Sequence, residues 1–492
     1  MTTATATTAT PAHRYDVVII GAGIAGCAAA QALAQADDGR HRKILLIDRH
    51  PGSSPRFAGE FIHPRGAQIL ADLGFYDALK AAGAVDVDGF TVLERADGRY
   101  VELPYGEIPE QRPQGLAAHH KTLVRTMRQV VAKTPQVELF EGWVITDLLR
   151  SGERVNGVVL TGPGGVSVKI HADLVIGADG KASQVRKLAG IPDQRHTVGF
   201  TVGLELRNAR LPAPTWGNII LGAWGPVLVY PISRDPNGDL TYRVTLDLPA
   251  NLPAKGARLA EFLLETFVPF LPHPLADQIA DAIVRHKGPF EMAPTVNLPA
   301  PTAVQPGLAL IGDAGGCSHP ITASGMTMGL RDAECLGEEA RRRHDAPVHE
   351  AWLDDSSLRR YRAEHDRYVP TRQALADAIY EVFRGGNEGA RAIQRALFEY
   401  WASGPVARAR SMALLSCAEG RPQVFLTEYL KAARYAIESS LVARHAAHLP
   451  TRDRLRQVSG AVQLASNKLG LVAQVMWAQV RPTWLPHDRT FI

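Results

Sequence analysis

The sequence predicts an α/β protein that combines a Rossmann-like nucleotide-binding domain, an inserted antiparallel-sheet domain and a helical C-terminal region. Three observations predict this class: a strand–helix–strand pattern near the N-terminal end, β-rich runs over 200–248, and helical spacing over about 354–480. The length of 492 residues agrees with it, because a chain of this size exceeds what one compact core normally holds.

The strand–helix–strand pattern opens with the apolar run YDVVII at 15–20, which is followed by glycines and an Ala-rich stretch over 24–35. A second apolar run, KILLI at 43–47, ends at Asp48. Continuous apolar runs of this length are typical of parallel strands that are buried on both faces. We therefore expect a βαβ unit here, with further strands within 137–160, 173–177 and 308–312.

The order of these patterns predicts domains that are discontinuous in the sequence. We expect the nucleotide domain at 14–90, 115–195 and 305–345, and a β-rich substrate domain at 91–114 and 196–304. The helical region should cover 346–492. Residues 1–13 should form a disordered tail, because the Thr/Ala-rich start lacks the basic residues and apolar core of a secretory signal.

The composition excludes several classes of function. The net charge of +4 is small for this length, and no stretch gathers lysine and arginine as a nucleic-acid-binding face would. Four scattered cysteines without a CxxC pair argue against a disulfide framework and against a metal site, and fit a reducing cytoplasm. No window reaches the roughly 18 apolar residues of a membrane span, so at most attachment to a membrane surface is expected.

The glycine-rich turn between the first strand and helix predicts a dinucleotide site. Gly21 permits the tight turn, Gly23 lets the backbone approach a pyrophosphate, and Gly26 allows close packing of helix on strand. The start of the helix, including Ala25, offers N–H groups and a positive dipole end to the phosphates. Asp48 should accept from a ribose hydroxyl, which favours FAD or NAD over NADP, and Arg49 beside it joins the predicted cofactor residues.

Two further motifs indicate that the nucleotide is FAD. The first, Asp179-Gly180 followed by Ser183 and Arg186, resembles the DGxxSxVR signature of flavin-dependent aromatic hydroxylases, and its Ser183 and Arg186 can cap and fix the next helix. The second follows the run LALIG and begins with Gly312-Asp313. In the superfamily it resembles, this aspartate holds the ribityl chain, and a Pro and Gly-rich turn presents backbone N–H groups to the isoalloxazine. The matching residues here are Pro320, Gly325 and Met326.

Beyond the flavin motifs, the chain resembles the squalene epoxidase (squalene monooxygenase) family over most of its length. The similarity lies in GEFIHPRG at 59–66, PVLVY at 226–230, HP at 319–320 with GMT at 325–327, and IYEVF at 379–383. It implies FAD, O2, and epoxidation or hydroxylation of an apolar substrate through a flavin C4a-hydroperoxide. Two positions depart from the family: His63 stands where it carries Gln, and Phe90 where it carries Tyr. We therefore expect a prenylated, polyene or aromatic natural product rather than squalene.

Several other side chains are candidates for the site. Arg56 should touch the cofactor or form a surface salt bridge, and Glu60 should fix the same loop. His63 either polarises the substrate and relays a proton, or is a loop histidine satisfied by the backbone. On the helix expected at 120–131, Lys121 and Arg128 are candidates for reaching FAD, with Arg128 the better match because of its guanidinium fork. Val144 completes the predicted cofactor set.

An apolar pocket wall should include Phe90, Trp224, Tyr230 and Pro320, although the three aromatic residues suit a core equally well. The stretch 460–480 is largely apolar. It either packs on the body of the protein or lies against a bilayer to admit a lipophilic substrate.

Two other functions fit the same motifs. One is an FAD-dependent reductase or dehydrogenase acting on isoprenoid double bonds, as geranylgeranyl reductases do, and the other is a non-catalytic flavin-binding protein. The electron donor also stays open between NADH, NADPH and a separate reductase, because the sequence holds no second GxGxxG motif.

Overall fold

The computed structural model describes residues 13–37, 39–53, 59–94, 100–222, 225–344 and 350–442. Residues 1–12 of the expected tail, the stretch 460–480, Arg56 and Trp224 lie outside the described residues. Within these ranges, no helix combines the length and the hydrophobicity that crossing a bilayer requires.

An eight-stranded sheet forms the nucleotide domain. Its central strands are parallel: β1 (Arg14–Ile20) lies between β2 (Ile44–Asp48) and β11 (Ser167–Gly177), flanked by β8 (Val137–Glu141) and β18 (Leu308–Leu310). Three antiparallel strands complete the sheet, namely β9 (Val144–Ser151), β10 (Arg154–Thr161) and β17 (Val304–Gln305). The predicted Rossmann-like fold is confirmed, with β1 and β2 joined through α1 (Ile24–Gln35).

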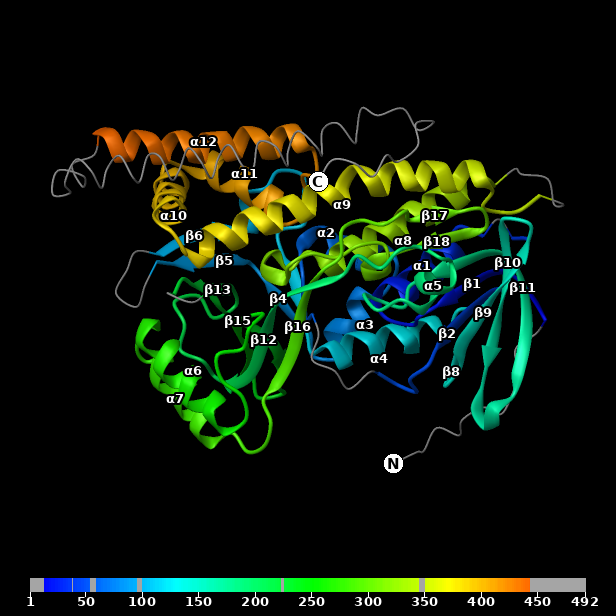
Figure 1. Cartoon of the computed structure of the whole chain (residues 1–492), viewed down its shortest axis with the longest axis horizontal. Helices are drawn as coiled ribbons and strands as arrows, with labels where there is room; N and C mark the ends of the chain where they lie inside the picture. The colour runs from blue at the N-terminus through cyan, green and yellow to red at the C-terminus, as the bar shows by residue number, and fades with distance from the viewer. Residues whose placement is uncertain are drawn as a thin grey trace.

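Helices α1, α4 (His120–Val131) and α8 (Gly325–Arg342) pack together on this sheet (Figure 1). Small residues bring α1 and α8 together: a Cβ on Gly337 would stand 3.0 Å from the Cβ of Ala32. Shorter helices lie around this layer: α2 (Pro64–Asp72), α3 (Tyr76–Ala81) and α5 (Gln184–Leu188). The layer holds α1 rigidly at the carboxyl ends of the strands, where doubly wound sheets bind ligands.

A seven-stranded sheet forms the second body of the fold. Its order is β16 (Glu291–Asn297), β12 (His196–Arg207), β15 (Leu240–Pro249), β14 (Val227–Arg234), β13 (Gly217–Ile220), β5 (Gly89–Leu93) and β6 (Tyr100–Pro104). The sheet is antiparallel, as expected, except that β5 and β13 pair in parallel. The parallel pair arises because β5 comes from an earlier part of the chain. Strand β5 also crosses the domain boundary that was expected between residues 90 and 91. The expected division into domains stays a prediction.

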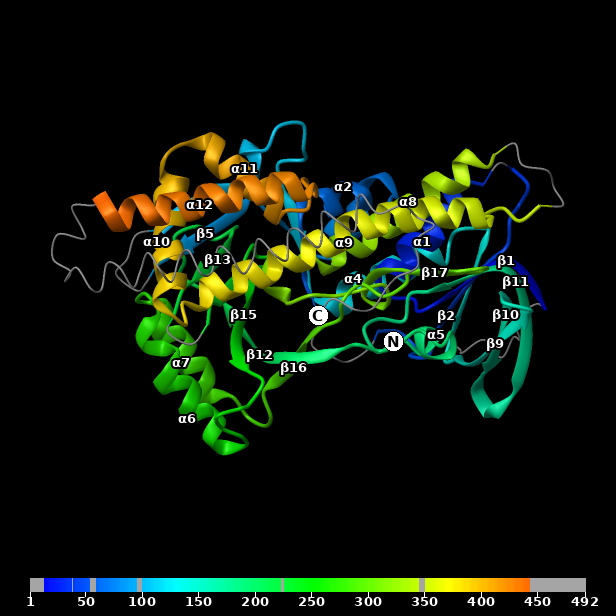
Figure 2. The same ribbon diagram turned by 45° about the horizontal axis from the view of Figure 1, so that its top comes forward.

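Helices cover both faces of this second sheet. One face carries α6 (Ala257–Thr266) and α7 (Leu275–Arg285), whose apolar side chains share a core with β12, β14 and β15. The other face packs against α9 (Asp355–Arg384), α10 (Glu388–Ala402), α11 (Pro405–Leu415) and α12 (Pro422–Val442). Figures 1 and 2 show α9 running from the nucleotide domain across to the second sheet.

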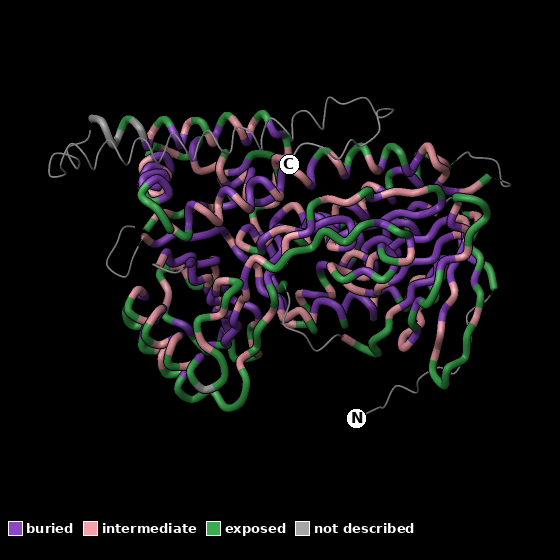
Figure 3. The backbone as a smooth tube through the Cα atoms, viewed as in Figure 1, coloured by how far each residue is buried: buried purple, intermediate pink, exposed green. Residues whose placement is uncertain are grey.

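A small three-stranded sheet of β3 (Phe61–Ile62), β7 (Gly115–Ala117) and β4 (Val85–Val87) lies between the two larger ones. Most residues of its strands are buried, and Figure 3 shows buried backbone in the interior of the molecule with exposed backbone along the outer helices and loops. Gly59 is exposed, and the segment that begins there enters the interior at once, since residues 60–64 are buried.

Candidate functional site

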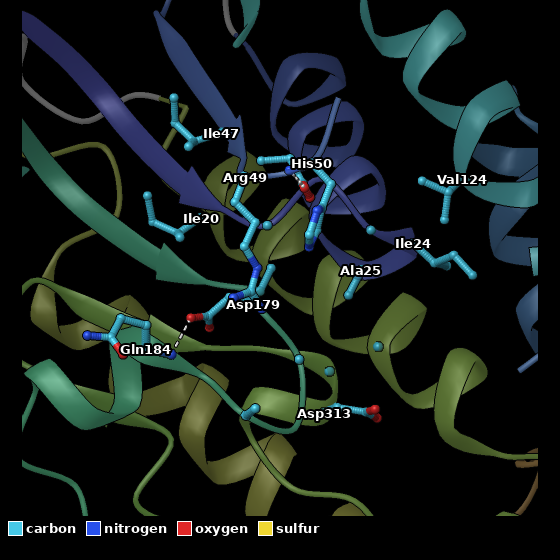
Figure 4. Close-up of a pocket in the computed structure, with 18 of the residues that line it drawn as sticks. Ile20, Ile24, Ala25, Ile47, Arg49, His50, Val124, Asp179, Gln184 and Asp313 are labelled. Carbon is cyan, nitrogen blue, oxygen red and sulfur yellow. Dashed lines mark hydrogen bonds between the residues drawn. The ribbon is translucent and has the colours of Figure 1, made fainter. Parts of the chain in front are cut away.

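A pocket opens at the carboxyl ends of β1, β2 and β11, against the start of α1 (Figure 4). It brings together most of the cofactor residues predicted from the sequence. These lining residues are Gly21, Gly23, Ala25, Asp48, Arg49, Arg128, Val144, Asp179, Gly180, Gly312, Asp313, Gly325 and Met326.

The glycine-rich turn has the geometry that a pyrophosphate needs. Gly21 has φ +109°, and a Cβ there would stand 2.4 Å from the carbonyl oxygen of Ala178. A Cβ on Gly26 would stand 1.8 Å from the oxygen of Gly21, whereas one on Gly23 would meet nothing within 4 Å. Helix α1 has no side-chain cap and no acidic residue in its first turn, so its N–H groups and dipole are available to phosphate oxygens. The described residues fit FAD.

Arg128 organises the loops around the turn. Its guanidinium donates to the oxygen of Ala22 at 2.8 Å, to that of His50 at 2.9 Å and to Oε1 of Glu141 at 2.6 Å, and it pairs with Asp48 at 2.8 Å. Most donors of this guanidinium are engaged by the protein, but Arg128 also lines the pocket, so its contact with FAD stays a prediction. Asp48 also accepts from the N–H groups of Ala22 and His50, each at 2.8 Å, which leaves one lone pair on Oδ1 for a ribose hydroxyl.

The DG motif joins two parts of the pocket. Asp179 accepts from the N–H groups of Gln184 at 2.6 Å and Val185 at 3.0 Å, and burial raises the pKa of its carboxyl. Ser183 caps α5 by accepting from the N–H of Arg186 at 2.9 Å, as the sequence predicted. The buried guanidinium of Arg186 donates to the oxygen of Ala314 at 3.1 Å, so this motif also steadies the GD turn.

The turn at Gly312-Asp313, called the GD turn here, is held by Asp332, a residue that the sequence did not single out. Gly312, with φ +57°, donates its N–H to Oδ2 of Asp332 at 2.7 Å, and Tyr368 donates to the other oxygen of this carboxylate. Asp332 is fully buried, and desolvation raises the pKa of its carboxyl. Asp313, next in the chain, lines the pocket, where it can meet a ribityl hydroxyl.

Glu60 lies outside the pocket lining and fixes its loop, as one of the expectations stated. Arg243 of β15 binds it with both arms, Nε to Oε2 at 2.7 Å and Nη2 to Oε1 at 2.8 Å. Tyr230 approaches the same carboxylate at 3.5 Å. The segment beside the nucleotide pocket is thereby joined to the second sheet by a buried ion pair, which was not predicted.

The geometry around His63 does not support its predicted role in catalysis. Its Nε2 lies 2.6 Å from the oxygen of Thr322, so this nitrogen carries the proton, and Nδ1 accepts from the hydroxyl of Tyr105 at 2.6 Å. Burial lowers the pKa of the imidazole to about 4. Both nitrogens are engaged and the ring stays neutral near pH 7, so His63 orders the loop, which was the alternative expectation.

The remaining expected residues divide between the pocket and its surroundings. Lys121 and Pro320 are exposed, and neither lines the pocket; the neighbour of Lys121, His120, does, and its Nδ1 lies 3.0 Å from the oxygen of Gly59. Trp143 and Gln184 also line the pocket. The sequence did not predict them, because neither stands at a motif position that is associated with cofactor binding.

Phe90 and Tyr230 meet in an aromatic cluster with Phe61, His63 and Tyr105. The ring centroids of Phe61 lie 5.1 Å from Phe90 and 5.6 Å from Tyr230, and those of Phe90 and Tyr105 are 6.2 Å apart. All five side chains are buried. The cluster begins two residues after Gly59, where a Cβ would contact Met326 of the pocket at 3.4 Å. A buried, largely aromatic region thus lies close to the end of the nucleotide pocket.

Comparison with known proteins decides which family this site belongs to. The family model for squalene epoxidase matches residues 171–452, more than half of the chain. The chain belongs to the squalene epoxidase family. Models for a Rossmann-like NAD(P)-binding domain and an FAD-binding domain match residues 19–82 and 66–243.

Curated members of the squalene epoxidase family resemble the chain over most of its length. Squalene epoxidase erg1 of Aspergillus fumigatus is 31% identical, over 80% of this chain and 80% of that protein. Squalene epoxidase 3 of Arabidopsis thaliana is 29% identical, over 96% and 86%. The motifs, the pocket and the family together show an FAD-dependent monooxygenase that epoxidises an apolar substrate with O2.

Solved structures confirm the fold. The p-nitrophenol 4-monooxygenase PnpA of Pseudomonas putida superposes with a TM-score of 0.67 at 18% identity, over 82% of this chain and 99% of that one. The flavin-dependent brominase Bmp2 superposes with a TM-score of 0.66 at 18% identity, over 87% and 98%. At this identity the likeness concerns the fold alone.

Proposed function

We propose that this protein uses FAD to insert one atom of O2 into a lipophilic, unsaturated or aromatic substrate other than squalene, such as a prenylated or polyene natural product. The observation that carries the proposal is the course of the segment 59–63. It starts against Met326 in the nucleotide pocket and ends in the aromatic cluster. An apolar substrate in that cluster would lie beside the reactive ring of a flavin in the pocket.

Each part of the site has a task in this proposal. The first turn of α1 binds the pyrophosphate, Asp48 the ribose, and Asp313 the ribityl chain. The bound flavin supplies the activation of O2, and the protein has to orient both partners and exclude water. The buried aromatic side chains support the exclusion of water, and the Glu60–Arg243 pair keeps the loop between the two regions in place.

The proposal that the substrate is not squalene rests on His63 and Phe90. His63 is held between Tyr105 and Thr322, and Phe90 presents no hydroxyl, so the cluster offers a substrate mainly apolar and aromatic surface. Such a surface selects by shape and hydrophobicity, and discriminates weakly against isosteric polar substituents.

The electron donor and the membrane contact are further parts of the proposal. NADPH, NADH or a separate reductase would reduce the flavin, as the family permits. A lipophilic substrate would be taken up from a membrane surface through the C-terminal helices, with the enzyme otherwise in the cytoplasm. The stretch 460–480, for which either packing on the body of the protein or contact with a bilayer was expected, lies outside the described residues.

An oxygen electrode tests the function. FAD-loaded enzyme is reduced with NADPH, NADH or a reductase, and O2 uptake is followed with squalene, a prenylated aromatic compound and a polyene. The proposal expects uptake matched by an oxygenated product with at least one substrate other than squalene. Saturation of a double bond under strict anaerobiosis would instead identify the isoprenoid reductase. FAD binding with no product under any condition would identify a non-catalytic flavin-binding protein.

A further inference from the structure

A buried pair of polar side chains lies against the turn that follows the GD motif. His319 caps the short helix η5 (Pro320–Thr322), and its Nδ1 accepts from the N–H of Ile321 at 3.2 Å. Since Nδ1 accepts, the proton of the neutral ring must be on Nε2. That nitrogen faces Oδ1 of Asp247 at a distance of 3.5 Å.

The pair is shielded from water, and the hydroxyl of Tyr380 is a further polar neighbour that hydrogen-bonds the Asp247 side chain. The side chains of His319 and Asp247 are 4% and 10% exposed. Among the described residues, neither His319 Nε2 nor Asp247 Oδ1 has a hydrogen-bond partner within normal geometry. Tyr380 of α9 stacks on the imidazole with the ring centroids 3.8 Å apart. Burying His319 Nε2 and Asp247 Oδ1 without partners is costly unless the two atoms share a hydrogen, so the arrangement points to a function.

Three parts of the chain meet at this point. His319 belongs to the turn beside the flavin, Asp247 to strand β15 of the second sheet, and Tyr380 to the helix that spans both domains. The other end of the same turn is held by His63, which binds the oxygen of Thr322. The backbone N–H groups of the turn, which should face the isoalloxazine, are thus fixed from two sides.

We propose that Asp247 is a positioning residue for the flavin: it holds His319 in the Nε2–H tautomer, and His319 then holds the turn through Nδ1. This inference rests on the binding of FAD in the pocket. Its consequence is that the shape of the flavin turn depends on a strand of the second sheet, since loss of the Asp247 acceptor would free the imidazole to rotate or change tautomer.

Two substitutions at position 319 separate the two contacts. In His319→Asn the amide oxygen takes the place of Nδ1 and can still accept from Ile321, while the group facing Asp247 is lost. In His319→Gln the amide nitrogen takes the place of Nε2 and faces Asp247, while the cap on the turn is lost. A merely space-filling histidine would respond to both changes alike.

FAD affinity and the visible circular dichroism of the bound flavin are the readouts. We expect His319→Asn to keep both within about twofold of the unsubstituted protein, and His319→Gln to weaken FAD binding about fivefold, the loss of one ordinary hydrogen bond, with an altered flavin spectrum. Asp247→Leu should behave like His319→Gln, and Asp247→Asn, which keeps an acceptor, like the unsubstituted protein.

Controls keep these outcomes distinct. Far-ultraviolet circular dichroism without FAD checks folding, and His286→Asn changes an exposed histidine that also contacts a backbone oxygen. Equal effects of the two substitutions at 319, or an unchanged spectrum and affinity in Asp247→Leu, would overturn the proposal. Failure of the unsubstituted protein to bind FAD would overturn the flavin site itself, and not only the role of Asp247.

Discussion

Arg243 and Glu60 form a bidentate ion pair in which the two side chains are only 4% and 3% exposed. The pair joins β15 of the second sheet to the segment that leaves the nucleotide pocket. Two further carboxylates, those of Glu205 and Glu291, approach the same guanidinium from the sheet side at 3.1 and 2.9 Å. The contact between the two domains is therefore electrostatic at its centre, and its geometry depends on the arginine fork.

Removing the arginine should be far more damaging than removing an exposed one. Arg243→Met leaves the Glu60 carboxylate buried without its counter-ion, and we expect a loss of about 3–5 kcal/mol in the free energy of unfolding, measured by urea denaturation. The control, Arg285→Met, breaks an exposed pair with Asp281 and should cost less than about 1 kcal/mol. Similar losses of unfolding free energy in the two variants would show that the buried pair stabilises the protein no more than an exposed pair does.

The glycine-rich turn permits a matched comparison of two alanine substitutions. A Cβ on Gly23 meets no protein atom within 4 Å, so Gly23→Ala should fold normally while weakening FAD binding roughly tenfold or more, because the methyl group enters the space of the phosphates. Gly26→Ala places its Cβ 1.8 Å from the oxygen of Gly21 and should destabilise the protein by about 1–3 kcal/mol even without FAD.

Fluorescence titration with FAD and thermal unfolding without it measure the two effects. Normal FAD affinity in Gly23→Ala would mean that the pyrophosphate does not lie on this turn. Normal stability in Gly26→Ala would mean that α1 is not packed as closely on the turn as described.

His63 should contribute to the pH dependence of stability. Its pKa is about 4 in the folded protein and about 6.5 when unfolded, so the unfolded state binds the proton first as the pH falls. The contribution of the neutral ring is present above pH 6.5 and is lost as the pH falls towards 4, at roughly 1.4 kcal/mol per pH unit. His63→Gln, which can still donate to Thr322, should remove this component.

Urea denaturation of both proteins between pH 4 and 8 isolates the difference, since the other titrating groups are shared. The rise and fall of activity with pH should be the same in His63→Gln as in the unsubstituted protein. Disappearance of a limb with a pKa near neutrality would contradict the structural role of His63 and restore the catalytic one.

Arg128 should act on FAD through the loops that it holds. Arg128→Lys loses the fork that binds Ala22, Asp48 and Glu141 together, and we expect roughly tenfold weaker FAD binding. Arg125→Lys, on the exposed side of the same helix, serves as the control and should leave the affinity unchanged. Equal affinity in the two variants would show that the loops keep their shape without Arg128.

Structural features that depend on residues close together in the sequence could be predicted. The turn at Gly21 and Gly23, the strand before it and the cap of α5 by Ser183 are local motifs, and the structure contains each of them. The contacts of Arg243 with Glu60 and of Asp332 with Gly312 join residues that are far apart in the sequence. No local sequence motif marks Arg243 or Asp332, so these contacts could not be predicted.

The roles of His63 and of β5 show the same limit. A histidine in a flavin-proximal loop could be catalytic or structural, and only its burial between Tyr105 and Thr322 separates the two. The parallel pairing of β5 with β13 depends on the path of the whole chain, which the alternation of apolar residues does not report.

The most direct test of the central conclusion is the source of the oxygen in the product. Reduced, FAD-loaded enzyme is given 18O2 and an unsaturated lipophilic substrate that supports O2 uptake, and the product is analysed by mass spectrometry. We predict one 18O atom in each product molecule, and less labelled product from the Gly23→Ala protein at an FAD concentration that loads only the unsubstituted protein. Product that carries oxygen only from water, or a saturated product formed without O2, would contradict it.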